Sequence, residues 1–163
     1  MATFRTNPHR LPSERYEGDE TIHFVARIVG PEPLFRDPDV VSIFASKLGQ
    51  FSERYGCWVP IYCFMPDHLH AMVKGSRSTS RPKQVIDSFK ISSGIWLSRK
   101  RPEYSWLGDY FDHLMRVGHD WKRHAFYILN NPVRAGLIED PYEYPGNGCI
   151  GYRLEQLFHD LTD

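Results

Sequence analysis

The sequence predicts an α+β domain built on one antiparallel sheet. Segments in which apolar and polar residues alternate, as on half-buried strands, lie at residues 20–29, 57–74 and 110–117. Segments with apolar residues at helical spacing lie at residues 38–55, 82–99 and 121–131. With a hairpin inside 57–74, the order is βαββαβ plus a C-terminal helix, the pattern of a ferredoxin-like sheet with an added helix.

Length and composition favour one domain. The chain has 163 residues, 41% hydrophobic and 25% charged, and no apolar run approaches the roughly 18 residues that span a bilayer. The first residues lack the apolar core of a signal peptide, so we expect a cytoplasmic protein without a membrane partner, as a monomer or homodimer. We expect an arm at 1–19, the domain at 20–145 and a tail at 146–163.

The first strand and the first helix have clear limits. Ile22, Phe24, Ala26 and Ile28 alternate with more polar residues, and Gly30-Pro31 ends the strand. Asp37 followed by Pro38 is typical of a helix start, and Gly56 ends that helix.

A hairpin then carries two histidines. Residues 57–64 are aromatic and β-branched, Pro66-Asp67 interrupts them, and a second strand begins at His68. Successive strand side chains point to opposite faces, so His68 and His70 should share one face while Leu69 enters the core. Two neutral imidazoles side by side can hold a metal ion; two exposed histidines on a strand are the alternative.

The second half of the chain begins with a basic loop at 75–82. Ser80 is expected to cap the helix at 82–99, which should bury Val85, Ile86, Phe89, Ile95 and Trp96. A fourth strand is expected from Tyr110 to Val117, with Arg116 among its polar residues.

The third helix contains a phenol and an amide on one face. Asp120 can cap it, Pro132 should end it, and Tyr127 and Asn131 are four residues apart. A tyrosine hydroxyl can act as a nucleophile when a metal or base activates it, although a half-buried packing role is the alternative. A last helix is expected at 154–161.

Charge is distributed unevenly although the net charge is zero. Residues 1–70 contain 7 basic residues (Lys and Arg) and 9 acidic residues (Asp and Glu). Residues 71–101 contain 8 basic and 1 acidic, and residues 102–163 contain 5 basic and 10 acidic. The middle block is therefore the candidate track for a polyanion such as nucleic acid, a solvated helix face being the alternative. Its candidate nucleic-acid-binding residues are Arg77, Arg81, Lys83 and Lys90.

Two motifs resemble a known family. Met65-Pro66-Asp67-His68-Leu69-His70, together with Tyr127-Ile128-Leu129-Asn130-Asn131-Pro132-Val133-Arg134-Ala135-Gly136-Leu137, is similar to the single-tyrosine HUH transposases, and most of all to the REP-associated tyrosine transposases. The resemblance extends over residues 21–145. Asp67 departs from it, because the family usually has Asn there.

The resemblance implies an endonuclease and strand transferase that acts on single-stranded, hairpin-forming repetitive palindromic DNA. It implies Tyr127 as the catalytic nucleophile that forms a 5′-phosphotyrosine, and His68, His70 and Asn131 as ligands of a divalent metal. Mg²⁺ or Mn²⁺ is expected, and because imidazole is softer than Mg²⁺ prefers, Mn²⁺ should serve at least as well.

Two other functions remain open from the sequence. A ferredoxin-like sheet can bind single-stranded nucleic acid without cutting it. A metal-dependent phosphoesterase would use His68, His70 and Asp67 or His113, with Tyr127 structural and no covalent intermediate.

Overall fold

The computed structural model describes residues 13–115 and 120–159. Its regular elements follow the predicted βαββαβ order in their first part. They are β1 Thr21–Val29, α1 Pro38–Arg54, β2 Cys57–Met65, β3 His68–Gly75, α2 Pro82–Lys100, β4 Ser105–Trp106 and β5 Phe111–Leu114. The C-terminal part adds α3 Trp121–Leu129, α4 Asn131–Arg134, β6 Asn147–Ile150 and α5 Leu154–Phe158.

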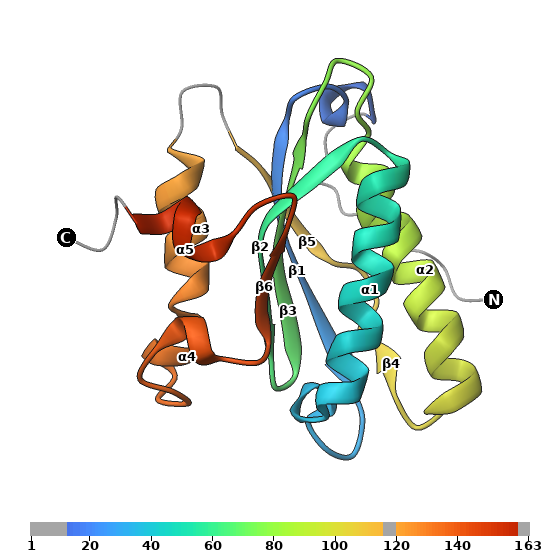
Figure 1. Ribbon diagram of the computed structural model, residues 1–163. Coiled ribbons are helices and arrows are strands. Elements are labelled where there is room, and N and C mark those ends of the chain that lie inside the picture. The colour runs from blue at the N-terminus through green and yellow to red at the C-terminus, as the bar shows by residue number, and fades with distance from the viewer. Residues whose placement is uncertain (1–12, 116–119, 160–163) are drawn as a thin grey trace.

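One antiparallel sheet separates two helical layers. Its strand order is β4-β1-β3-β2-β6, with β5 pairing the other end of β1, and every pairing is antiparallel. Helices α1 and α2 cover one face of the sheet, and α3 and α5 lie on the other (Figure 1). The predicted α+β class is therefore confirmed.

Each face of the sheet has its own core. Phe24, Phe44 and Phe89 are fully buried between the sheet and the α1–α2 layer. Met72 and Phe158 are fully buried on the α3 side. Burying one such side chain stabilises the fold by about 1.5–3 kcal/mol, so both layers are held mainly by apolar contact.

Several predicted helix features hold and two are wrong. Asp37 caps α1 through the backbone N–H of Asp39, as expected. Ser80 does not cap α2, because its hydroxyl donates to the Gly56 carbonyl and accepts from the N–H groups of the preceding turn. Ile95 is 48% exposed, and Ser93 and Leu97 occupy the buried side instead.

The third helix also differs from its prediction. Asp120 caps α3 as expected, but α3 ends at Leu129. Pro132 does not end the helical path; it lies in the first turn of α4, where a missing N–H is tolerated.

The expected fourth strand is shorter than 110–117, because regular pairing with β1 is confined to Phe111–Leu114. Arg116 and Val117 lie outside the described residues, as do residues 1–12 of the expected arm and 160–161 of the expected last helix. Strand β6 is not predicted from the sequence. It pairs with β2, so residues 147–150 belong to the sheet.

The described part of the chain contains no helix that is both long and apolar enough to cross a bilayer. The three cysteines are free thiols; Cys57 and Cys63 are buried, and burial raises the pKa of Cys63 to about 12.

Candidate active site

The two histidines of β3 share one face of the sheet. The centroids of the His68 and His70 rings are 5.1 Å apart, while Leu69 between them is fully buried on the opposite face. The alternation of the strand places both imidazoles on the side that α3 covers. The predicted juxtaposition of the pair is therefore present.

The Nδ1 atom of each of these imidazoles is in hydrogen-bond contact with another side chain of the protein. His68 Nδ1 lies 2.7 Å from Oδ1 of Asp67, so the ring donates to the carboxylate, and this hydrogen bond lowers the pKa of Asp67. His70 Nδ1 lies 3.0 Å from Nε2 of His23 on β1. In both residues Nε2 is the nitrogen left to offer to a ligand.

His23 links His70 to helix α3. Its Nδ1 lies 2.9 Å from Nε2 of His124, and the rings of His23 and His70 stack with centroids 5.3 Å apart. Burial, and then the neighbouring histidines, lower the pKa of His23 to about 3. Burial, and then His68, lower the pKa of His70 to about 4. Both rings are neutral near pH 7, and neutral imidazole is the form that binds metals.

Tyr127 is open to solvent on α3. Its side chain is 61% exposed, and Cζ of Arg134 lies 3.5 Å from the centroid of its ring. An exposed phenol with a cation on its face is accessible to a phosphodiester, more so than the half-buried packing tyrosine that is the alternative from the sequence.

Asn131 meets the same guanidinium. Nη2 of Arg134 donates to Oδ1 of Asn131, so Tyr127 and Asn131 gather around one arginine although α3 and α4 are separate helices. The charge of Arg134 also lowers the pKa of His70. Helix α4, which carries Arg134, lies on the same side of the sheet as α3 (Figure 1).

The residues present fit a metal ion in part. Two Nε2 atoms on one strand, with both Nδ1 atoms already hydrogen-bonded, are a preorganised pair of ligands. Among the described residues, no three His, Cys, Asp or Glu side chains form a group that could hold a metal. A third protein ligand within this part of the chain would therefore be of another type, such as the amide oxygen of Asn131.

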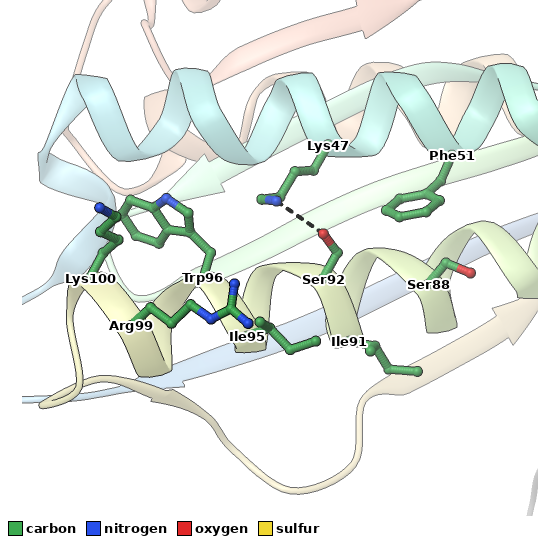
Figure 2. Close-up of a pocket in the computed structure, with 9 residues that line it drawn as sticks. All are labelled: Lys47, Phe51, Ser88, Ile91, Ser92, Ile95, Trp96, Arg99 and Lys100. Carbon is green, nitrogen blue, oxygen red and sulfur yellow. Dashed lines mark hydrogen bonds between the residues drawn. The ribbon is translucent and has the colours of Figure 1, made fainter.

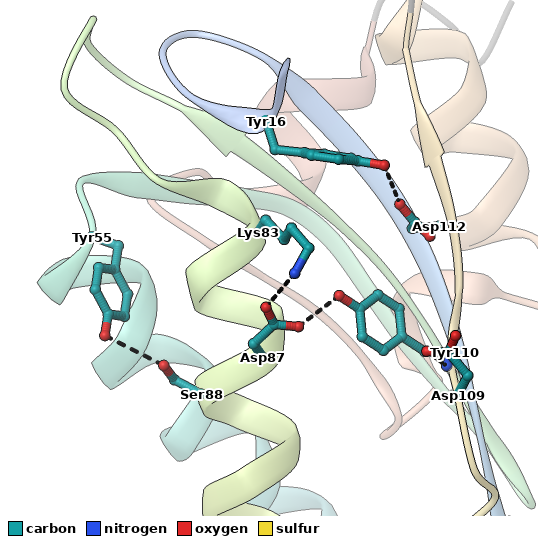
Figure 3. Close-up of polar contacts among 8 residues, drawn as sticks. All are labelled: Tyr16, Tyr55, Lys83, Asp87, Ser88, Asp109, Tyr110 and Asp112. Carbon is teal, nitrogen blue, oxygen red and sulfur yellow. Dashed lines mark hydrogen bonds and ion pairs between the residues drawn. The ribbon is translucent and has the colours of Figure 1, made fainter. Parts of the chain in front are cut away.

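The four basic candidates lie away from the histidine pair, on α2 and the loop before it. Lys83 pairs with Asp87 at 2.5 Å, and Asp87 also accepts from the Tyr110 hydroxyl (Figure 3). Lys90 lies over the rings of Trp106 and Tyr110. Arg77 and Arg81 are exposed at the N-terminal end of α2.

The same helical layer has a groove between α1 and α2. Its volume is about 530 Å³, Lys47 donates to Ser92 across it, and Ile91, Ile95 and Arg99 lie along α2 (Figure 2). The groove is on the sheet face opposite His68 and His70, so it is not part of the histidine site.

Sequence reasoning missed His23, His124 and Arg134 as members of the site. For His23 a signal existed, because strand alternation already places it on the polar side of β1. The pairing of β1 with β3, which brings it to His70, needs the tertiary structure.

Comparison with known proteins places the chain in a family. The family model described as "Transposase IS200 like" matches residues 19–122, well over half of the chain. The chain belongs to the IS200-like transposase family. The matched region includes His23, His68 and His70 and ends before Tyr127 and Asn131.

Two known proteins are similar to this chain. A Haemophilus influenzae protein named as a REP-associated tyrosine transposase is 25% identical, over 66% of this chain and 67% of its own length. A solved structure of a REP-associated tyrosine transposase bound to a REP hairpin superposes with a TM-score of 0.60 at 16% identity, over 90% of this chain and 82% of that one. At that identity the structural likeness shows the fold alone.

Proposed function

We propose that this IS200-like transposase is a divalent-metal-dependent endonuclease and strand transferase for single-stranded DNA. The observation that supports the proposal is a pair of adjacent β3 imidazoles on the sheet face that α3 covers. Helix α3 is linked to His70 through His124 and His23, and it carries a solvent-exposed tyrosine. A hairpin formed by a repetitive palindrome is the proposed DNA, because the similar solved structure is bound to a REP hairpin.

His68, His70 and Asn131 would hold Mg²⁺ or Mn²⁺. A metal bound there supplies Lewis-acid stabilisation of the charge on the scissile phosphate. The protein orients both imidazoles through their Nδ1 atoms and keeps His70 neutral, and Arg134 adds a positive charge beside the phenol.

Tyr127 is the proposed nucleophile. Its hydroxyl loses a proton to solvent and its oxygen forms a bond to the scissile phosphorus. The bond from that phosphorus to the 3′ oxygen breaks, and the 3′ oxygen takes up a proton from solvent. The products are a 5′-phosphotyrosine and a free 3′-hydroxyl. Attack by another 3′-hydroxyl on the phosphotyrosine reverses the step and joins strands, so no nucleotide cofactor is consumed.

The test incubates end-labelled hairpin single strands with the protein and Mn²⁺ and separates the products on a denaturing gel. Tyr127→Phe removes one exposed oxygen, so it should fold and bind DNA like the wild type, with unfolding free energy within about 0.5 kcal/mol. It should form no covalent adduct and cut nothing. Tyr142→Phe is the matched control, and it should form the covalent adduct and cut the DNA like the wild type.

Continued cleavage by Tyr127→Phe would show that water is the nucleophile and would favour a phosphoesterase. Binding without cleavage in the wild type, with Mg²⁺ and with Mn²⁺, would favour a non-catalytic nucleic-acid-binding module.

A further inference from the structure

Three imidazoles form a continuous hydrogen-bonded chain from the sheet to the tyrosine helix. His70 Nδ1 and His23 Nε2 are 3.0 Å apart, and His23 Nδ1 and His124 Nε2 are 2.9 Å apart. These hydrogen bonds link β3 to β1 and β1 to α3. His124 precedes Tyr127 by three residues, one turn of the same helix.

The proton positions along such a chain depend on one another. A neutral imidazole carries one proton, so each ring donates at one nitrogen and accepts at the other. If His70 binds a metal through Nε2, its proton is on Nδ1 and is donated to Nε2 of His23. His23 must then carry its proton on Nδ1 and donate it to Nε2 of His124. The opposite direction would place a proton on Nε2 of His70 and block the metal.

We propose that His23 and His124 are positioning residues for the metal site and the nucleophile helix. His23 holds His70 in the tautomer that presents Nε2 to the metal. His124 accepts the last hydrogen bond of the series, so the position of α3, which carries Tyr127, is coupled to the same arrangement of protons. Metal occupancy is thereby transmitted from β3 to the helix of the nucleophile. This inference rests on the proposed function, because it requires a metal at His70.

The first test reads the tautomers directly by ¹⁵N NMR of histidine-labelled protein, titrated with Mg²⁺ alone. In the Mg²⁺-saturated wild type, His70, His23 and His124 should each carry the proton on Nδ1. In His23→Phe, the ring of His124 should no longer respond to Mg²⁺. A proton on Nε2 of His124 in the saturated wild type, or an unchanged response of His124 in His23→Phe, would overturn the inference.

The second test measures Mn²⁺ affinity by electron paramagnetic resonance without DNA. Loss of a hydrogen bond that orients a ligand histidine typically weakens metal binding about 10- to 100-fold, and this is expected for His23→Phe. His23→Gln keeps an acceptor for His70 and should recover most of the affinity. It also keeps the test decisive if the Phe variant does not fold.

His159→Phe is the matched control, because His159 is exposed just after α5 and its Nδ1 contacts the carbonyl of Gln156 rather than the three linked imidazoles. Its affinity should equal that of the wild type. Affinity of His23→Phe and His23→Gln within about twofold of the wild type would contradict the positioning role.

The two proposals fail in different ways. If neither His68 nor His70 responds to Mg²⁺ or Mn²⁺ in the wild type, the proposed metal site is wrong and this inference falls with it. If both respond while the His23 variants behave like the wild type, only this inference is wrong.

Discussion

The two ligand candidates owe their orientation to different neighbours. His68 donates its Nδ1–H to the Asp67 carboxylate, whereas His70 contacts the imidazole of His23. A carboxylate behind a ligand histidine fixes its tautomer and makes the ring more basic. We therefore expect Asp67, where the family usually has Asn, to strengthen metal binding through His68.

We expect Asp67→Ala to weaken Mn²⁺ binding by about tenfold, because His68 loses its hydrogen-bond acceptor. Asp67→Asn keeps an acceptor oxygen without the charge, so its affinity for Mn²⁺ should lie between those of Asp67→Ala and the wild type. Isothermal titration calorimetry with Mn²⁺ measures all three. Equal affinities, or tighter binding by Ala, would show that the carboxylate does not support His68.

At this scale the sequence predicted some contacts and could not predict others. The shared face of His68 and His70 follows from the two-residue period of a strand, which is local. The grouping of Tyr127 and Asn131 follows from helical spacing, and it survives the break before α4 because Arg134 contacts both. The contact of His23 with His124 joins residues 101 positions apart, and no local pattern contains it.

At the scale of elements, the basic block and the tyrosine belong to different layers. Helix α2 packs with α1 on one face of the sheet, and α3 lies on the other (Figure 1). DNA that touches both would have to pass around an edge of the sheet. Lys83 and Lys90 lie beside the β4–β5 segment, which forms one such edge.

The internal contacts of these cations predict unequal roles in DNA binding. Arg77→Ala and Arg81→Ala should each reduce the slope of log affinity against log salt by about one unit, because each removes a phosphate contact. Lys83→Ala should change it less, since that ammonium already pairs with Asp87. Binding of a hairpin single strand is measured by fluorescence anisotropy at several salt concentrations. Unchanged slopes in both arginine variants would place the DNA track elsewhere.

The elements that the sequence predicted are those with strong local signals. α1 has a capping Asp37 and a proline at its start, and the β2–β3 hairpin has a clear turn at Pro66-Asp67. β6 has four partly buried residues with glycines around it, and only pairing with β2 makes it a strand. The exposure of Ile95 likewise depends on how α2 packs on α1, which helical spacing alone does not determine.

At the scale of the whole molecule, the C-terminal residues complete the second core. Phe158 of α5 is fully buried and packs on Phe126 of α3, with ring centroids 5.7 Å apart. Asn147 in β6 donates through Nδ2 to the carbonyls of Leu129 and Pro141, both at 2.9 Å. The expected tail therefore holds helix α3 against the sheet.

Phe158→Ala should lower the free energy of unfolding by about 3–5 kcal/mol, since it leaves a cavity in a packed core. Urea denaturation followed by circular dichroism measures this loss. Ile91→Ala, at a residue that is 65% exposed, is the control and should change the stability by less than about 0.5 kcal/mol. A small effect of Phe158→Ala would mean that α5 is not a structural part of the domain.

We expect Tyr127 to become covalently bound to DNA, and trypsin provides a direct way to test this. Cleavage after Arg123 and Arg134 releases the peptide His124–Arg134, in which Tyr127 is the sole tyrosine. After reaction with hairpin single strands and Mn²⁺, followed by nuclease digestion, mass spectrometry should find this peptide enlarged by a nucleotide 5′-phosphate on Tyr127. An unmodified peptide alongside cleaved DNA, or the added mass on any other residue, would contradict the account.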